Sequence, residues 1–127
     1  MEQIIDSQKT GNMRVAVATY EGVLVNQHLG MADSLLIFEV NQEGYRQVAR
    51  RRTPRPGNGN ERWNLLAREL VDCDALLVNS LGQTPLDILT SAGLKVYQVD
   101  GLIEDALRDL YDGVELRMPQ HAPKCRC

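Results

Sequence analysis

Residues 34–40, with the sequence SLLIFEV, limit most strongly how this chain can fold. The run is almost entirely apolar, so we expect both faces of a strand made from it to be covered. Residues 13–19 form an earlier β-rich run, and residues 45–51 return after a loop at 41–44 that is typical of a β-hairpin. The first half of the chain therefore predicts antiparallel strand pairing.

The second half of the chain alternates helical patterns with short apolar runs. We expect, in order, a helix from about Glu61, a strand at 75–79, a helix that ends at Gly93, a strand at 95–99 and a helix that ends at Gly113. The apolar stripe of the first helix consists of Trp63, Leu66, Ala67, Leu70 and Val71. Alternation of this kind produces right-handed crossovers between parallel strands.

Two of these helices begin with N-cap patterns. Asn60 directly precedes the first helix. Thr84 precedes Pro85, a residue that suits the first helical position. Both patterns predict that a polar side chain accepts from the free N–H groups at the start of its helix.

These elements combine into a three-layer α/β fold, in which helices flank a mixed sheet of about five strands. Within the 127 residues we expect a flexible leader at 1–12, an α/β domain at 13–117 and a flexible C-terminal tail at 118–127. The chain has the usual size of one compact domain, and it contains no internal repeat.

Charge and apolar runs argue against several classes of protein. The formal net charge of -3 and the pI near 5.3 argue against a general nucleic-acid binder. No apolar run approaches the length of a membrane span, and no signal peptide is recognisable. The three cysteines are an odd number and do not make a disulfide framework. We therefore expect a cytoplasmic protein that binds neither nucleic acid nor membrane.

The loop at 26–30, with the sequence NQHLG, is the most informative candidate for a binding site. A neutral imidazole such as that of His28 is a good iron ligand, and the partner of its second ring nitrogen tunes its affinity. Asn26 and Gln27 can supply hydrogen bonds nearby, and Gly30 lets the backbone turn and a bulky ligand approach. The alternative is a surface histidine that has no functional role.

A basic stretch lies in the middle of this mildly acidic chain. It contains Arg50, Arg51, Arg52, Arg55 and Arg62. Arg52 comes at the end of a predicted strand, and Arg55 lies with Gly57 and Gly59 in a loop that opens a helix. Arginines together with free N–H groups at a helix N-terminus suit a multiply charged anion. The alternative is a solvated edge strand that is protected by charge.

The cysteines are a third candidate for metal binding. Cys125 and Cys127 form a C-x-C pair that can offer two thiolates to a soft metal or a cluster. Such a pair lacks the four ligands of a closed site, and the alternative is a flexible tail. Cys73, between a predicted helix and a predicted strand, is expected to be a small core residue.

Catalytic patterns are missing from the sequence. It contains no G-x-S-x-G nucleophile motif, no G-x-x-x-x-G-K-[ST] phosphate loop and no dinucleotide fingerprint. The run at 13–19 carries none of the acidic residues that two-metal nucleases use. We therefore expect a protein that is not an enzyme. A hydrolase built around Arg55 and Gly57 is the weakest alternative, because no general base accompanies that loop.

A joint pattern of short segments runs through nearly the whole expected domain. The segments are 14–17, 21–22, 25–30, 37–40, 57–59, 62–63, 66–67, 72–73, 92–94, 101–104 and 111–113. With these residues the chain resembles the dinitrogenase iron–molybdenum cofactor biosynthesis family, which includes NifX, NafY and the C-terminal domain of NifB. The resemblance covers about residues 13–117 and is strongest to the NifB C-terminal domain.

The resemblance implies a ribonuclease H-like fold and binding of the iron–molybdenum cofactor or its iron–sulfur precursor. The family's H-[LF]-G motif supplies the histidine expected to ligate the cofactor, and that position is His28 here. The implied function is a non-catalytic carrier, with nitrogenase or cofactor-assembly proteins as partners. The C-x-x-x-C-x-x-C motif of the NifB radical-SAM domain is absent from this sequence. The alternative is a regulatory protein-interaction module of the same fold without a bound cluster.

Overall fold

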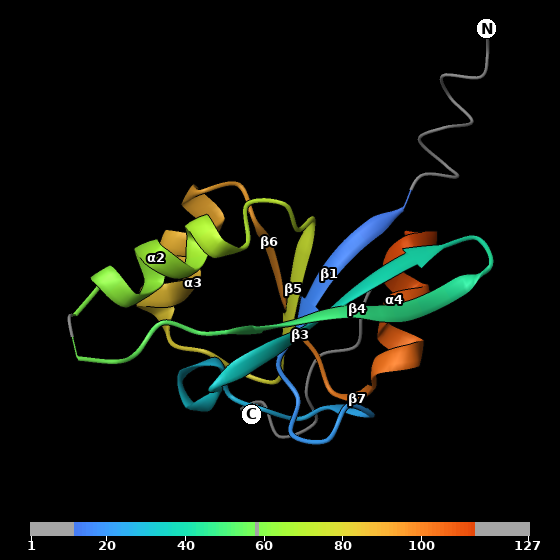
Figure 1. The fold of residues 1–127 in the computed structure, drawn as a ribbon, viewed down its shortest axis with the longest axis horizontal. Helices are drawn as coiled ribbons and strands as arrows, with labels where there is room; N and C mark the ends of the chain where they lie inside the picture. Colours follow the sequence, from blue (N-terminus) through green and yellow to red (C-terminus); the bar gives the residue numbers. More distant parts are fainter. Residues whose placement is uncertain (1–11, 58, 114–127) are drawn as a thin grey trace, which may run out of the picture.

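A five-stranded sheet forms the centre of the computed structural model, which describes residues 12–57 and 59–113 (Figure 1). Its strands are β1 (Met13–Val17), β3 (Ser34–Asn41), β4 (Gly44–Arg52), β5 (Ala75–Val78) and β6 (Lys95–Gln98). Their order across the sheet is β4-β3-β1-β5-β6. β1 and β4 lie antiparallel to β3, whereas β5 lies parallel to both β1 and β6. The prediction of a mixed sheet of five strands is confirmed.

β3 is covered on both faces, as its apolar sequence predicts. Four consecutive residues of this strand, 35–38, are buried. Leu35 and Ile37 face one helical layer, and Leu36 and Phe38 face the other. A strand with both faces buried exposes no side chains to water, so polar residues do not alternate with apolar ones along it. This explains the continuous apolar run.

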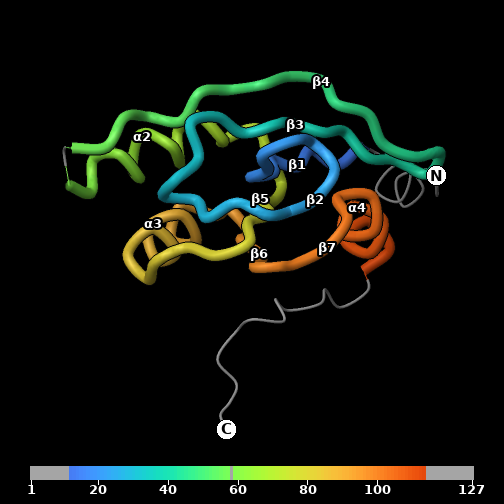
Figure 2. The backbone as a smooth tube through the Cα atoms, turned by 90° about the horizontal axis from the view of Figure 1, so that it is seen from below, coloured from blue at the N-terminus to red at the C-terminus, as the bar shows by residue number. Residues whose placement is uncertain are grey.

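Three α-helices of the described residues complete the layers. α2 (Glu61–Glu69) and α3 (Gln83–Ser91) cover one face of the sheet, and α4 (Ile103–Asp112) covers the other (Figure 2). The main side chains are Leu66, Leu70, Leu76 and Leu89 in the first layer, and Val15, Val17, Leu77 and Leu107 in the second. Removing this apolar surface from water stabilises the sheet from both sides, so the expected α/β class is confirmed.

Two short elements lie beyond the carboxyl ends of the parallel strands. β2 (Leu24–Val25) pairs antiparallel with β7 (Gly101–Leu102) in a separate two-stranded sheet. η1 (Leu29–Met31) is a single 3-10 turn that follows β2. The sequence does not predict the 3-10 turn.

The starts of two helices and one stripe residue differ from the predictions. Val71 lies past the end of α2 and is 84% exposed, so it does not belong to the buried stripe. The side chain of Asn60 makes no capping hydrogen bond. α3 takes Gly82 instead of Thr84 as its N-cap, which places Pro85 third in the helix. The missing N–H of proline costs nothing there, because the first four N–H groups of a helix have no intrahelical partner.

Glycines end the last two helices, as predicted. The φ angles of Gly93 and Gly113 are +98° and +79°, values that strain any residue with a side chain. After α3, the N–H of Leu94 donates to the carbonyl of Leu89 over 3.1 Å. The same carbonyl also accepts from the N–H of Ala92 (3.2 Å), so both bonds close the end of the helix.

The leader and tail expected from the sequence lie outside the described residues, apart from Asn12. Residues 114–117 of the expected domain lie outside them as well. In the part of the chain that the structure describes, no helix has the length and apolar character that crossing a membrane requires.

Candidate functional site

The histidine loop, defined here as residues 26–31, lies against the carboxyl end of β5. The backbone N–H of Asn79 donates to the carbonyl of Gln27 (3.1 Å), and the N–H of Leu29 donates to the carbonyl of Ser80 (2.9 Å). Because Asn79 and Ser80 directly follow β5, these bonds continue the pairing of the central sheet into the loop. The histidine is therefore attached to the edge where the parallel strands end.

The side chain of Asn79 ties three segments together at this edge. Its Nδ2 donates to the carbonyls of Val25 (3.3 Å) and Val99 (3.2 Å), and it lies 3.4 Å from a carboxylate oxygen of Asp100. Val25 belongs to β2, whereas Val99 follows β6. Ligands of α/β sheets bind outside the carboxyl ends of the parallel strands, so the topology favours a site at this edge.

The ring of His28 is exposed, and one of its nitrogens already has a partner. Nδ1 accepts a hydrogen bond from the backbone N–H of Gly30 (2.9 Å), which makes His28 the N-cap of η1. A nitrogen that accepts carries no proton, so the neutral ring carries its proton on Nε2. Nε2 makes no hydrogen bond with residues 12–57 or 59–113. The ring is thus held by the backbone at one nitrogen and exposes the other.

Gly30 packs closely against the ring of His28. A Cβ at this residue would lie 3.1 Å from Cε1 of the ring and 3.2 Å from Nδ1. Both distances are shorter than ordinary van der Waals contact. The φ angle of Gly30 is not positive, so the backbone conformation does not explain the glycine. Gly30 therefore allows the ring of His28 to approach the backbone closely. That Gly30 also lets a ligand approach stays a prediction.

Asn26 and Gln27 make their hydrogen bonds near or within the loop. Asn26 accepts from the N–H of Tyr20 (3.0 Å) and donates to the carboxylate of Glu21 (2.8 Å). Gln27 is 7% exposed, and its Nε2 lies 3.4 Å from the carbonyl of Met31. Both side chains therefore brace the loop that holds the histidine. Their contact with a ligand stays a prediction.

The segment after β4 is bonded to the turn that follows the histidine loop. The N–H of Thr53 donates to the carbonyl of Asp33 (3.0 Å), and its hydroxyl donates to the carbonyl of Ala32 (2.6 Å). These bonds bring the chain around Arg52 and Arg55 close to the loop. Both arginines are exposed and make no side-chain hydrogen bond or ion pair with a residue that the structure describes. Their role towards an anion stays a prediction.

Arg62 links these two segments; the sequence places it in the basic stretch, but only Arg52 and Arg55 of that stretch were predicted to contact the cofactor. It is 8% exposed, its Nε donates to the carbonyl of Pro54 (2.9 Å), and an Nη donates to the carbonyl of Gly30 (3.2 Å). The guanidinium carbon lies 4.5 Å from the centre of the Trp63 ring. The overlooked signal was spacing, because Arg62 lies four residues before Leu66 and so shares the buried face of α2.

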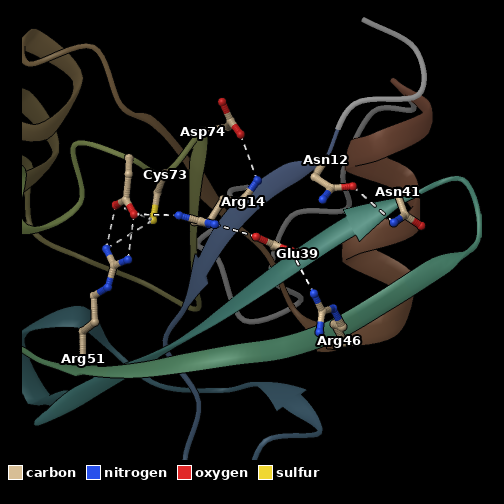
Figure 3. A network of polar contacts seen from close by, with 9 residues as sticks. Asn12, Arg14, Glu39, Asn41, Arg46, Arg51, Cys73 and Asp74 are labelled. Carbon is tan, nitrogen blue, oxygen red and sulfur yellow. Dashed lines mark hydrogen bonds and ion pairs between the residues drawn. The ribbon is translucent and has the colours of Figure 1, made fainter. Parts of the chain in front are cut away.

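A separate group of charges joins β1, β4 and the turn after α2 (Figure 3). The carboxylate of Asp72 accepts hydrogen bonds from Arg51 (2.7 Å) and Arg14 (2.9 Å), and Arg14 also pairs with Glu39. The guanidinium of Arg51, assisted by that of Arg14, holds the pKa of Asp72 well below its usual range. Arg51 is therefore engaged in holding the fold together.

Cys73 lies beside this charged group and is buried, as predicted. Burial raises the pKa of its thiol to about 11, so the thiol stays protonated at neutral pH. A protonated thiol is a poor metal ligand. Cys125 and Cys127 lie outside the described residues. Among residues 12–57 and 59–113, no group of three or more His, Cys, Asp or Glu side chains could hold a metal ion.

A cavity of about 1150 Å³ lies at the opposite end of the sheet from the histidine loop. Its wall includes Met13 at the start of β1, Tyr45 after the β3–β4 turn, and Leu107 on α4. β1 runs from this cavity towards the end of the sheet that carries the loop. None of the predicted site residues that the structure describes lines the cavity, so the cavity is distinct from the histidine loop.

Comparison with known families identifies the kind of domain. The family model described as dinitrogenase iron–molybdenum cofactor matches residues 11–113, the span that contains every described helix and strand. The chain belongs to this family. The resemblance predicted from short segments of the sequence is therefore confirmed.

Curated relatives of this family member carry the name FeMo cofactor biosynthesis protein NifB. The protein of Chlorobaculum tepidum is 43% identical over 105 residues, which are 81% of this chain and 25% of the relative. The protein of Azotobacter vinelandii is 34% identical over 106 residues, which are 76% of this chain and 21% of the relative. The chain thus spans a quarter or less of the length of these two relatives.

Solved structures share the fold of this family member. The crystal structure of PH0822 superimposes with a TM-score of 0.63 and covers 86% of this chain and 98% of that chain. The two sequences are 21% identical, so the likeness concerns the fold alone. It supports the mixed α/β architecture described above.

Proposed function

We propose that this chain is a non-catalytic carrier of the iron–molybdenum cofactor or its iron–sulfur precursor, and that His28 is an iron ligand. Membership of the family and the names of the NifB relatives support the cluster as cargo. The observation that carries the role of His28 is its exposed ring on a loop at the carboxyl ends of the parallel strands. Few protein ligands suit a cargo that must later be released, because few bonds have to break.

Binding of iron by His28 competes with the cap that the ring provides. In the described state Nδ1 accepts from the N–H of Gly30, and Nε2 carries the proton. Iron takes a nitrogen without a proton, so either Nδ1 leaves the cap or the proton moves from Nε2 to Nδ1. Both routes break the hydrogen bond to Gly30, which costs about 1 kcal/mol. The cap thereby lowers the affinity for the cluster by about fivefold and favours release.

Charge near the loop supports an anionic cargo. Arg52 and Arg55 are exposed, and they flank Thr53, which is bonded to the turn after the histidine loop. Guanidinium groups make strong hydrogen bonds to anions. In this proposal the two arginines offset the negative charge of the cluster. Cys125 and Cys127 belong to the proposal as further ligands on the strength of their sequence pattern alone.

Two further features support a carrier of ribonuclease H-like fold. The order β4-β3-β1-β5-β6, with β3 antiparallel to its neighbours, agrees with that architecture. Two-metal nucleases place acidic residues on the strands of such a sheet, whereas β1 (Met13–Val17) contains none. The partners in this proposal are nitrogenase or cofactor-assembly proteins that deliver or accept the cluster.

A protein-interaction module without a cluster is the second candidate function. Leu24 and Leu102 face each other across β2 and β7, and they are 39% and 43% exposed. Val23 beside them is 54% exposed. Neighbouring apolar side chains on the surface favour contact with a protein. This candidate predicts that capture of an assembly protein is the same for the wild type and for His28→Ala.

Anaerobic titration with isolated iron–molybdenum cofactor tests the leading proposal. His28→Asn is the sharpest variant, because asparagine can still cap the N–H of Gly30 but has no imidazole for iron. We expect the wild type to bind and both His28→Asn and His28→Ala to lose at least about tenfold in affinity. Met31→Ala removes an exposed side chain from the same loop and is expected to bind as the wild type does. Equal binding by the wild type and His28→Asn would contradict the proposal.

A further inference from the structure

Arg62 is a buried cation without an acidic partner in the part of the chain that the structure describes. It is 8% exposed, and its two hydrogen bonds go to the backbone carbonyls of Pro54 and Gly30. Burying a charge is costly unless an opposite charge or strong hydrogen bonds compensate it. Two carbonyl dipoles compensate only part of a full charge, so the field of Arg62 favours an anion nearby.

The guanidinium of Arg62 has donors to spare. Arginine carries five N–H donors in a planar fork, and Nη2 of Arg62 makes no hydrogen bond with residues 12–57 or 59–113. The ring of Trp63 stacks against the guanidinium carbon at 4.5 Å. α2 therefore holds the fork in a defined place while some of its donors remain uncommitted.

Gly30 connects this fork to the histidine. Its carbonyl accepts from Arg62 (3.2 Å), and its N–H donates to Nδ1 of His28 (2.9 Å). A residue that is bonded at both its N–H and its C=O has little freedom, so its position depends on both partners. A change at Arg62 must therefore reach the ring of His28.

We propose that Arg62 is the positioning residue of His28 and that its buried charge makes the site prefer anionic over cationic metal species. This inference rests on the proposed function and adds to it the residue that selects the charge of the cargo. Salt screens the exposed charges of Arg52 and Arg55 over about 8–10 Å. Arg62 is shielded from solvent, so its field is screened less.

Lysine and glutamine at position 62 separate the two parts of the proposal. Arg62→Lys keeps the charge but lacks the planar fork that reaches Pro54 and Gly30 together. Arg62→Gln removes the charge. Arg68→Gln is the matched control, because Arg68 lies on the same helix, is exposed and makes no side-chain bond with a described residue.

Nitrogen-15 NMR of the His28 ring in the cluster-free full chain measures its positioning. The signal is assigned in a His121→Gln background, since the chain has two histidines. We expect the wild type to show an accepting Nδ1 and a protonated Nε2. Arg62→Lys and Arg62→Gln are expected to shift both resonances, whereas Arg68→Gln leaves them in place. Unchanged resonances in both Arg62 variants would overturn the positioning role.

Two probes of opposite charge test the selection. Isolated iron–molybdenum cofactor is the anionic probe, and zinc ion alone, followed by the His28 resonances, is the cationic one. We expect Arg62→Gln to weaken cofactor binding by about tenfold and to leave zinc binding unchanged or tighter, because a nearby cation has been removed. Arg62→Lys is expected to keep part of the preference for the anionic cofactor over zinc ion, because it keeps the charge. If Arg62→Gln weakens both probes equally, or neither, the selection by charge is wrong.

Failure of this inference and failure of the proposed function give different results. If the wild type binds the cofactor, His28→Asn does not, and both Arg62 variants bind as the wild type does, only the role of Arg62 is wrong. If the wild type itself does not bind the cofactor, the proposed function is wrong. The ring resonances and the zinc titration still decide the role of Arg62 in that case. Arg62→Lys keeps the experiment decisive if Arg62→Gln does not fold.

Discussion

The carboxylate of Asp72 accepts two hydrogen bonds from the guanidinium of Arg51, each 2.7 Å long. This bidentate pair joins the end of β4 to the turn that follows α2. Arg14 of β1 adds a third hydrogen bond to the same carboxylate, at 2.9 Å. Three segments that are far apart in the sequence therefore meet on one side chain, in a geometry that bidentate pairing defines closely.

Acid is expected to weaken the fold through Asp72. Because the arginines lower the pKa of this carboxyl in the folded chain, its ionised form stabilises the fold above the ordinary pKa of about 4. That contribution is lost as the pH falls through this value towards the folded pKa. Asp72→Asn should lower the free energy of unfolding by about 1 kcal/mol near neutral pH and by less at about pH 3.

Denaturant unfolding at several pH values measures this difference. Glu43→Gln is the control, because Glu43 is exposed in the β3–β4 hairpin and its side chain makes no bond with a described residue. Its free energy of unfolding should differ little from that of the wild type. A deficit of Asp72→Asn that is equally large at all pH values would show that the ionised pair does not contribute as described.

Cys73 is expected to resist alkylation in the folded chain. The residue is 9% exposed, and burial raises the pKa of its thiol to about 11, so little thiolate forms at mildly alkaline pH. Iodoacetamide should label it slowly in the native chain and quickly in denaturant. Mass spectrometry of the peptide that contains Cys73 measures both rates, and rapid labelling of the native chain would refute the burial argument.

Gly30→Ala is expected to push the ring of His28 out of its cap. The new Cβ would lie 3.1 Å from Cε1 and 3.2 Å from Nδ1, closer than ordinary contact, so the ring has to move away from it. Loss of the cap should lower the free energy of unfolding by about 1 kcal/mol. The freed Nδ1 should raise the affinity for zinc ion severalfold. Ring NMR and zinc titration measure these effects, and wild-type resonances in Gly30→Ala would contradict them.

Leu77 and Val71 test where the core lies. Leu77 of β5 is fully buried under α4, so Leu77→Ala should lower the free energy of unfolding by about 2–5 kcal/mol. Val71 is 84% exposed, and Val71→Ala should change the free energy of unfolding by less than about 0.5 kcal/mol. Denaturant unfolding measures both. Equal effects of the two substitutions would mean that Val71 belongs to the core after all.

Much of the fold could be predicted because its signals are local. The continuous apolar run at 34–40 predicted a strand covered on both faces, and β3 is buried on both. Gly93 and Gly113 predicted helix ends because only glycine adopts their positive φ angles without strain. Such signals depend on residues close together in the chain, so no partner from elsewhere is needed to interpret them.

The end of α2 shows where local signals fail. The apolar periodicity continues through Val71, yet the helix ends at Glu69. Arg51 donates to the carbonyl of Glu69 (2.8 Å) and pairs with Asp72. Arg51 belongs to β4, and its bond satisfies a carbonyl at the end of α2. The sequence pattern alone would extend the helix past this point. The contact of Arg51 with Glu69 and Asp72 thus accompanies the turn that exposes Val71.

The candidate site likewise has features that the sequence predicts and features that only the tertiary structure shows. The sequence by itself determined a histidine close to a glycine in a polar loop, together with a stretch of arginines further along the chain. Only the tertiary structure decided that the loop joins the carboxyl end of β5, that Gly30 holds Nδ1 of His28, and that Arg62 is buried against Gly30. The reason is physical. Residue type and periodicity are properties of neighbours in the chain, whereas burial and hydrogen bonding depend on which distant segments meet, and Arg62 lies 32 residues from Gly30.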